Sequence, residues 1–108
     1  MPIETTPTLE ILARAIDVAA LRQGVYASNI ANAGVADYRR MEVALEQGAA
    51  LPGTGVDVQP SIVATDSAVK LDEEMAAMAK NSLRYQILLG AFERSMSTLR
   101  LAVREGRE

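Results

Sequence analysis

Few residues in this chain could carry out chemistry. Its 108 residues include no histidine and no cysteine. Disulfides, zinc sites built from these residues and nucleophiles activated by histidine are therefore excluded. The remaining candidates are carboxylates, lysines, tyrosines and serines. We expect no catalytic residue, no metal site and no cofactor, so the chain is not expected to be an enzyme.

The most concentrated group of carboxylates is the run Asp72, Glu73 and Glu74. Three acidic residues could in principle hold a divalent cation. Consecutive helix residues point in different directions, however, so the run makes a poor single site. An acidic first turn is more typical of a helix start, where negative charge complements the helix dipole.

Two asparagines raise a different question. Asn29 and Asn32 lie in an alanine-rich run shortly before Gly34. Asparagine is unfavourable inside a helix because its side chain competes for backbone hydrogen bonds. We expect both side chains to bond backbone, in their own loop or in a neighbouring subunit, and so to fix where the chain leaves the helix. The alternative is that Asn32 is only a C-terminal cap and Asn29 faces solvent.

Composition sets the class of the elements that carry these residues. Hydrophobic residues make up 49% of the chain but aromatic residues only 4%, which favours helices over a sandwich or barrel. The net charge of −3 argues against nucleic acid or an anionic membrane surface as the main partner. No apolar run is long enough to span a membrane, and the first residues lack the pattern of a secretory signal.

Residues 8–33 are predicted to form the first helix, with Thr8 as N-cap and Gly34 as its stop. Apolar positions recur there in steps of three and four, the spacing of a coiled-coil seam. The seam positions are Leu9, Leu12, Ile16, Ala19, Gln23, Tyr26 and Ile30.

Residues 72–104 are predicted to form the second helix, with Asp72 as N-cap and arginines towards its end. The same spacing continues for nine positions, of which only Ser82 is not apolar. These seam positions are Met75, Met78, Ser82, Tyr85, Leu89, Phe92, Met96, Leu99 and Val103.

Residues 34–70 lose this periodicity and are rich in glycine and proline. They are predicted to be mostly irregular, with at most a short extended piece at 56–58. The fold class expected is therefore all-α: one domain with two long terminal helices packed as an antiparallel coiled-coil-like hairpin. Five seam residues are expected to be mutually buried, namely Leu12, Ile16, Leu89, Phe92 and Met96. An ordinary helical hairpin or a bundle fragment accounts for the periodicity equally well.

A second apolar stripe lies outside each seam. Its residues are Ile11, Val18, Leu21 and Val25 on the first helix and Leu83, Ile87 and Leu101 on the second. Exposed stripes of this kind mark protein interfaces, which points to a subunit that packs against copies or relatives of itself. The alternative is that the middle segment folds back over one stripe.

Both ends of the chain resemble bacterial flagellar axial proteins. Residues 21–23, 27–33 and Tyr38 resemble the N-terminal signature of the rod, hook and hook-filament proteins, and residues 69–75 with Asn81 and Tyr85 resemble the proximal rod type. The likeness covers 9–40 and 68–104. The positions that match the family motifs are Asn29, Ile30, Ala31, Asn32, Tyr38, Asp72, Glu74, Met75, Asn81 and Tyr85.

The resemblance departs from the family at one turn. The family usually has threonine-proline-glycine before the aromatic residue, whereas this chain has Val35, Ala36 and Asp37 before Tyr38. Aspartate tolerates the left-handed conformation that glycine adopts easily. The turn is therefore expected to survive through Asp37.

The resemblance implies a structural subunit of the proximal rod of the flagellar basal body. Such a subunit assembles helically through its terminal helices, helps transmit torque between membrane ring and hook in cell motility, and lies in the periplasmic rod after type III export without a cleaved signal. Its partners would be copies of itself, other rod proteins, proteins adjacent to the membrane ring and export-gate proteins, without nucleic acid or membrane insertion. A helical adaptor or export chaperone is the alternative. We expect the isolated monomer to be partly disordered at its ends.

Overall fold

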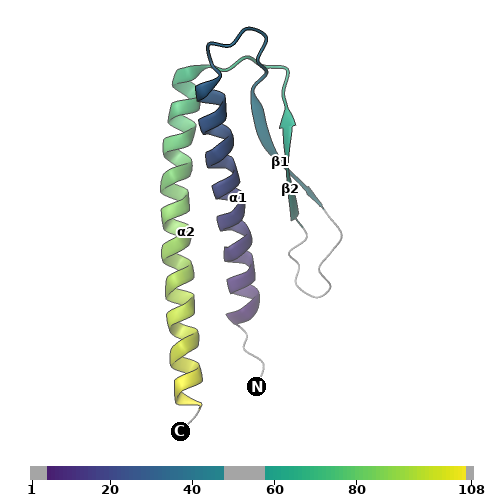
Figure 1. Cartoon of the computed structure of the whole chain (residues 1–108). Helices are drawn as coiled ribbons and strands as arrows, with labels where there is room; N and C mark the ends of the chain where they lie inside the picture. The colour runs from purple at the N-terminus through teal and green to yellow at the C-terminus, as the bar shows by residue number, and fades with distance from the viewer. Residues whose placement is uncertain (1–4, 48–57, 107–108) are drawn as a thin grey trace.

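The computed structural model describes residues 5–47 and 58–106. These residues form helix α1 (Thr5–Ala31), strands β1 (Met41–Gln47) and β2 (Val58–Ala64), and helix α2 (Leu71–Glu105). The helices lie side by side in opposite directions, and the strands form a hairpin on the other side of α1 (Figure 1). The fold is mostly helical, as predicted, but it is not all-α.

The molecule is long and thin. Its extents are 64 × 28 × 13 Å and its radius of gyration is 17.9 Å, whereas a compact domain of this length would have a radius near about 13 Å. Elements arranged in one layer cover one another only along their sides. The buried apolar core of the described residues accordingly consists of Ala19 and Val25, with 2% and 6% of their surface exposed.

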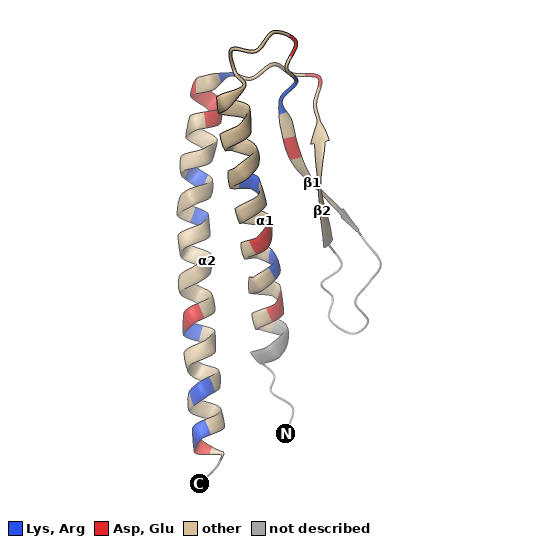
Figure 2. Ribbon diagram, in the orientation of Figure 1, with Lys and Arg blue, Asp and Glu red and all other residues tan. Residues whose placement is uncertain are grey.

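Both predicted N-caps are wrong. Helix α1 begins at Thr5, so Thr8 lies inside it. The N-cap of α2 is Lys70, which has extended backbone (φ −103°, ψ 106°) and provides no side-chain cap, while Asp72 lies within the first turn. The Asp72 Oδ1 atom accepts a hydrogen bond from the backbone N–H of Glu73 at 2.9 Å. The acidic start of α2 and the basic residues further along it still complement the helix dipole (Figure 2).

Helix α1 ends at Ala31, three residues before the predicted stop at Gly34. Two backbone hydrogen bonds continue the turn, from Ala33 N–H to Ile30 O at 3.2 Å and from Val35 N–H to Asn32 O at 3.0 Å. Gly34 therefore belongs to the turn that follows the helix. A side chain at Gly34 would meet no other atom within 4 Å.

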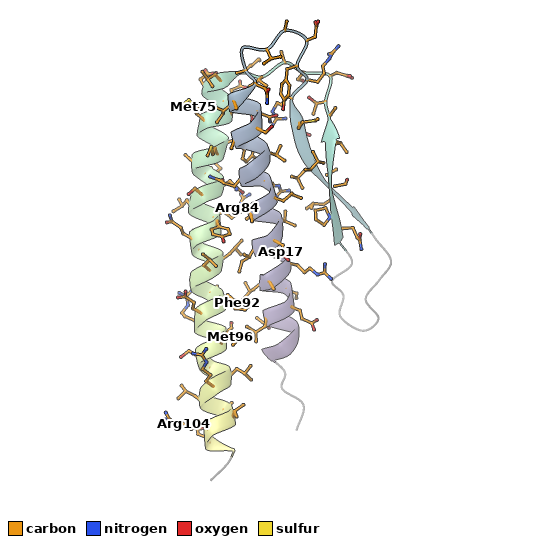
Figure 3. The ribbon with its side chains drawn as sticks, in the orientation of Figure 1. Asp17, Met75, Arg84, Phe92, Met96 and Arg104 are labelled. Carbon is orange, nitrogen blue, oxygen red and sulfur yellow. The ribbon has the colours of Figure 1, made fainter. Side chains whose placement is uncertain are left out.

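The seam between the helices is real but shallow. Asn81 on α2 lies opposite Ala19 on α1, which fixes the antiparallel register. The five residues expected to be mutually buried are only half-buried, because a single neighbouring helix covers one side of each; Phe92 and Met96 are labelled in Figure 3. The half-buried seam residues are Leu9, Leu12, Ile16, Gln23, Tyr26, Ile30, Met78, Ser82, Tyr85, Leu89, Phe92, Met96 and Leu99.

Two predicted seam residues lie outside this contact. Met75 is 56% exposed and Val103 is 43% exposed. The face of α2 that meets α1 is centred instead on Glu74 and Asn81, each 2% exposed. Because Met75 follows Glu74 by one residue, about 100° around the helix, it cannot share that face.

The middle segment contains a β-hairpin, so its prediction as mostly irregular is wrong. β1 pairs antiparallel with β2 from Met41–Ala64 to Gln47–Val58. Of the extended piece predicted at 56–58, only Val58 lies within the described residues, where it begins β2. Pro60 is accommodated in β2 because a strand of a two-stranded sheet always has a free edge.

The hairpin decides the fate of the second apolar stripe. On α1 it leaves Val25 buried and Val18 and Leu21 half-buried. The expectation that this stripe lies free is therefore wrong except at Ile11, which is 52% exposed. On α2 the stripe is uncovered among the described residues: Leu83, Ile87 and Leu101 are 59%, 62% and 54% exposed.

Candidate functional site

Asn29, near the end of α1, is the centre of a buried polar cluster. Its side chain is 0% exposed. The Oδ1 atom accepts hydrogen bonds from the Tyr38 hydroxyl at 3.1 Å and from the Met41 backbone N–H at 2.9 Å. The Nδ2 atom donates to the Met41 carbonyl at 2.9 Å and to Glu74 Oε2 at 3.1 Å. Both donors and both acceptor positions of the amide are therefore used.

The pair of bonds between Asn29 and Met41 resembles the pairing of two strands. Met41 is the first residue of β1, and its N–H and carbonyl both bond the same amide. The amide thus supplies backbone-like partners where α1 ends and the hairpin begins. We refer to Asn29, Tyr38, Arg40, Met41 and Glu74 as the polar junction.

The turn before the junction depends on one strained residue. Asp37 has φ 63°, which is the left-handed region that glycine occupies without penalty. The prediction that Asp37 would take the place of the family's glycine is confirmed at the level of backbone conformation. This conformation turns the chain so that Tyr38 reaches back to Asn29.

Asn32 has a more local role. Its Nδ2 atom donates to the Ser28 carbonyl of its own helix at 2.8 Å. The prediction that both asparagine side chains bond backbone is therefore confirmed. The alternative in which Asn29 faces solvent is wrong.

Glu74 brings α2 into the junction. Its carboxylate accepts from Asn29 through Oε2 and pairs with Arg40 Nε through Oε1. The Glu74 side chain is 3% exposed, whereas that of Arg40 is 22% exposed. Arg40 also pairs with the exposed carboxylate of Glu42. A buried carboxylate with both oxygens paired in this way ties the start of α2 to the hairpin.

The charge state of Arg40 follows from its neighbours. Burial would lower the pKa of the guanidinium, but hydrogen bonds and charges from Glu74 and Glu42 together outweigh burial and raise the pKa above its usual value. The cation therefore persists throughout the physiological pH range. Arg40 was not predicted, because nothing in its local spacing separates it from other surface arginines.

Backbone contacts close the base of the hairpin around Arg40. Its N–H donates to the Ser67 carbonyl at 2.9 Å, and its carbonyl accepts from the Thr65 N–H at 2.8 Å. Next to it, Arg39 Nη1 donates to the Asp66 carbonyl at 2.8 Å. The segment between β2 and α2 is thus held against the segment between α1 and β1.

A second buried amide joins the helices further along. Asn81 Nδ2 donates to the Ala19 carbonyl and to Gln23 Oε1, both at 2.8 Å. Its Oδ1 atom is buried and has no hydrogen-bond partner within the described part of the chain. Asn81 therefore fixes the register of α2 on α1 through side-chain bonds instead of apolar packing.

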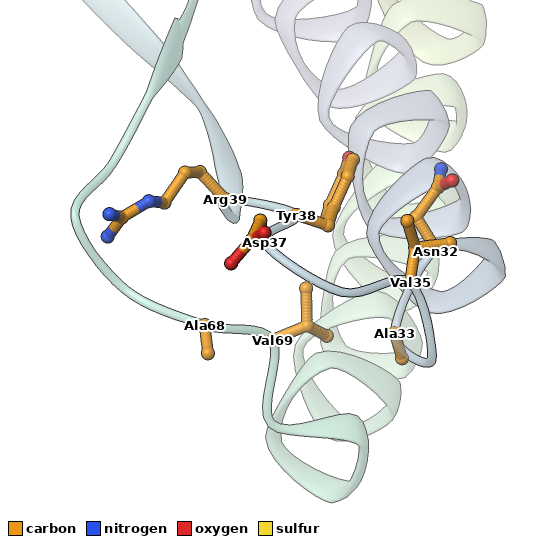
Figure 4. A pocket seen from close by; sticks show the side chains of 8 residues that line it. All are labelled: Asn32, Ala33, Val35, Asp37, Tyr38, Arg39, Ala68 and Val69. Carbon is orange, nitrogen blue, oxygen red and sulfur yellow. The ribbon is translucent and has the colours of Figure 1, made fainter.

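A depression of about 350 Å³ lies beside the junction, between the turn after α1 and the segment before α2 (Figure 4). Asn32, Asp37, Tyr38 and Val69 contribute to its walls. It contains no paired acid and base and no activated nucleophile. Across residues 5–47 and 58–106 there is also no group of three acidic side chains placed to hold a metal ion.

The motif residues divide between junction and surface. Asn29, Tyr38 and Glu74 meet in the junction, and Asn81 lies buried along the same helix pair. Ile30 and Tyr85 are half-buried between the helices, whereas Ala31, Asp72 and Met75 are exposed. Sequence reasoning therefore identified most of the buried polar groups, but it assigned Glu74 to the exposed helix start.

Comparison of the chain with protein-family models, curated proteins and solved structures found no match. Neither of the described helices is long and apolar enough to cross a membrane.

Proposed function

We propose that this chain is a structural subunit of the proximal rod of the bacterial flagellar basal body. It assembles helically through its terminal helices and helps transmit torque between the membrane ring and the hook. The observation that carries this proposal is the meeting of Asn29 and Tyr38 with Glu74. The family resemblance selects these residues from opposite ends of the sequence, and shared hydrogen bonding gives a reason for them to occur together.

The exposed apolar surface of α2 supports the same proposal. A thin molecule with Leu83 and Ile87 about 60% exposed has more apolar surface than its own elements cover. Neighbouring subunits would remove that surface from water, at about 25 cal/mol per Å² of apolar area. Its partners are accordingly copies of itself, other rod proteins, proteins next to the membrane ring and the export gate, and its place is the periplasmic rod.

A helical adaptor or export chaperone would also expose apolar helix faces. It would, however, have to fold alone, because it acts before assembly. Hydrogen exchange on dilute monomer separates the two functions. Weak protection of 9–33 and 72–104, with strong protection in assembled particles, is expected of a rod subunit. Strong protection of both helices in the dilute monomer would favour the adaptor.

The direct test is the composition of the basal body. Basal bodies purified from the source bacterium should contain the chain in helically arranged copies around the rod axis, visible by electron microscopy. The Asn29→Ala variant should fail to enter the rod, and Asn32→Ala is its matched control because its lost bond lies within α1. Basal bodies with complete rods but without this chain would refute the proposal.

A further inference from the structure

The exposed face of α2 carries a regular row of apolar residues. Leu71, Met75, Ala79, Leu83 and Ile87 follow at intervals of four and are all exposed, the four larger ones by 47–62%. Residues four apart form one of the ridges through which helices pack against neighbours. We call these five residues the apolar ridge. It extends over about 24 Å at 1.5 Å per residue.

A groove of about 530 Å³ lies elsewhere on the molecule, where α1, α2 and the hairpin border one another. Its exposed apolar walls include Ile11 and Leu45, which are 52% and 48% exposed. We call it the apolar groove; its apolar lining is Ile11, Ala15, Val18, Ala19, Leu45, Pro60 and Leu88. Along α1 it runs from Ile11 to Arg22, about 17 Å, which is comparable with the length of the ridge.

Charge selects the occupant of this groove. Its rim carries Arg14, Arg22 and Arg84 against the single carboxylate of Asp17. Within 5–47 and 58–106, the only salt bridges formed are those of Arg40, so the rim arginines have no carboxylate partner there. The rim thus favours an apolar partner with acidic neighbours.

The apolar ridge meets this requirement. Its first turn includes the exposed carboxylates of Asp72 and Glu73. The other exposed apolar residues of α2, Leu101 and Val103, lie beside Arg100 and Arg104. Those arginines would be repelled by the rim. Of the exposed apolar surfaces on α2, the ridge is therefore the complementary one.

We propose that the apolar ridge of one copy packs into the apolar groove of a second copy. This inference rests on the proposed function, because it names the surfaces through which the subunits would assemble. Ridge and groove are different surfaces, so each copy retains a free ridge or a free groove after pairing. Contacts of this heterologous type produce extended assemblies instead of closed dimers unless their rotation closes a ring.

Sedimentation of the purified full chain over a range of concentrations tests the ridge. Leu83→Gln should weaken self-association at least tenfold. Leu101→Gln is the matched control: it is similarly exposed (54% against 59%) and, 18 residues away, lies five full turns along the same side of the helix. Equal effects of the two substitutions, or no effect of Leu83→Gln, would overturn the proposal.

Cross-linking tests the pairing itself, and the chain has no native cysteine to interfere. Leu83→Cys and Ile11→Cys variants, mixed and oxidised, should form a mixed dimer, because a disulfide requires Cα atoms about 4.4–6.8 Å apart. Leu101→Cys mixed with Ile11→Cys should not. Predominant linkage of Leu83→Cys to itself would show ridge-to-ridge pairing and overturn the proposal.

The two proposals fail separately. A chain that enters rods and self-associates, yet gives no ridge-to-groove cross-link, overturns only this inference. A chain that cross-links as expected but is absent from complete rods overturns the proposed function. A wild-type chain that stays monomeric at millimolar concentration overturns the second copy as occupant of the groove.

Discussion

Replacing Asn29 by alanine should remove the centre of the polar junction and destabilise the fold severely. The substitution deletes four hydrogen bonds, each with a net value of about 1 kcal/mol. It also leaves Met41 backbone groups and one Glu74 oxygen without this partner, at about 1–3 kcal/mol for each group that water cannot reach. Alanine returns at most about 0.7 kcal/mol through helix propensity.

The expected loss is therefore about 3–5 kcal/mol of unfolding free energy, since these contributions overlap and do not simply add. A small domain has about 5–15 kcal/mol in total, so much of its stability would disappear. Urea denaturation followed by circular dichroism measures the change directly. A variant already unfolded without urea would place the loss at or beyond the wild-type stability.

Asn32→Ala is the control for this measurement. Asn32 is half-buried and its bond stays within α1, so its loss should change stability by less than about 1 kcal/mol. The reasoning would be refuted if Asn29→Ala cost less than about 1 kcal/mol, or no more than Asn32→Ala. Either result would mean that the junction is not a principal source of stability.

Further substitutions test the junction, the turn and the helices. Arg40→Met should cost about 3–5 kcal/mol because it strands the buried Glu74 carboxylate, whereas Glu74→Gln removes the charge but keeps an acceptor for the amide and should cost less; urea midpoints give the order. Asp37→Gly should raise stability by up to about 1 kcal/mol by relieving the left-handed conformation, and an unchanged or lower melting temperature would contradict this. Gly24→Ala should add about 0.5–1 kcal/mol, because a side chain there meets no atom within 4 Å; a loss of stability would be inconsistent with an open site. Leu89→Asp should abolish assembly by placing a charge in the helix seam, and normal rods carrying it would refute the seam's role in assembly.

The helices were predictable because their signal is long and local. Steps of three and four from Leu9 to Ile30 and again over α2 can arise only from a helical face. Their ends were less predictable, since the capping residues Thr8 and Asp72 compete with tertiary contacts that the sequence does not display. The first turn of α2 is positioned by Glu74, whose carboxylate contacts Asn29 and Arg40.

The hairpin was missed although β1 carries a strand signal. Met41, Val43 and Leu45 alternate with polar or small residues, which favours a half-buried strand. Its partner β2 includes Pro60 and has no such alternation, so the pair could be recognised only together. The hairpin also buried Val25, a residue whose spacing alone suggested an outer surface.

Within the junction, residue type was informative and spacing was not. An asparagine within a helix signals an unusual hydrogen-bonding requirement, and this identified Asn29 before its partners were known. Arg40 has no such signal, because arginine is ordinary at the surface. Which member of the run Asp72–Glu74 turns inward depends on where α2 meets Asn29, a relation between segments far apart in sequence.

That distance in sequence has a consequence for the order of events during synthesis. The bonds joining the helices link residues separated by 45 positions at Asn29–Glu74 and by 62 at Ala19–Asn81. When α1 has been made, its partner does not yet exist, and a lone helix draws little stability from its own hydrogen bonds. The hairpin strands are closer together and can pair earlier, whereas helix docking must await α2 and the closure of a long loop. The finished fold can therefore appear only where and when both terminal segments are free together.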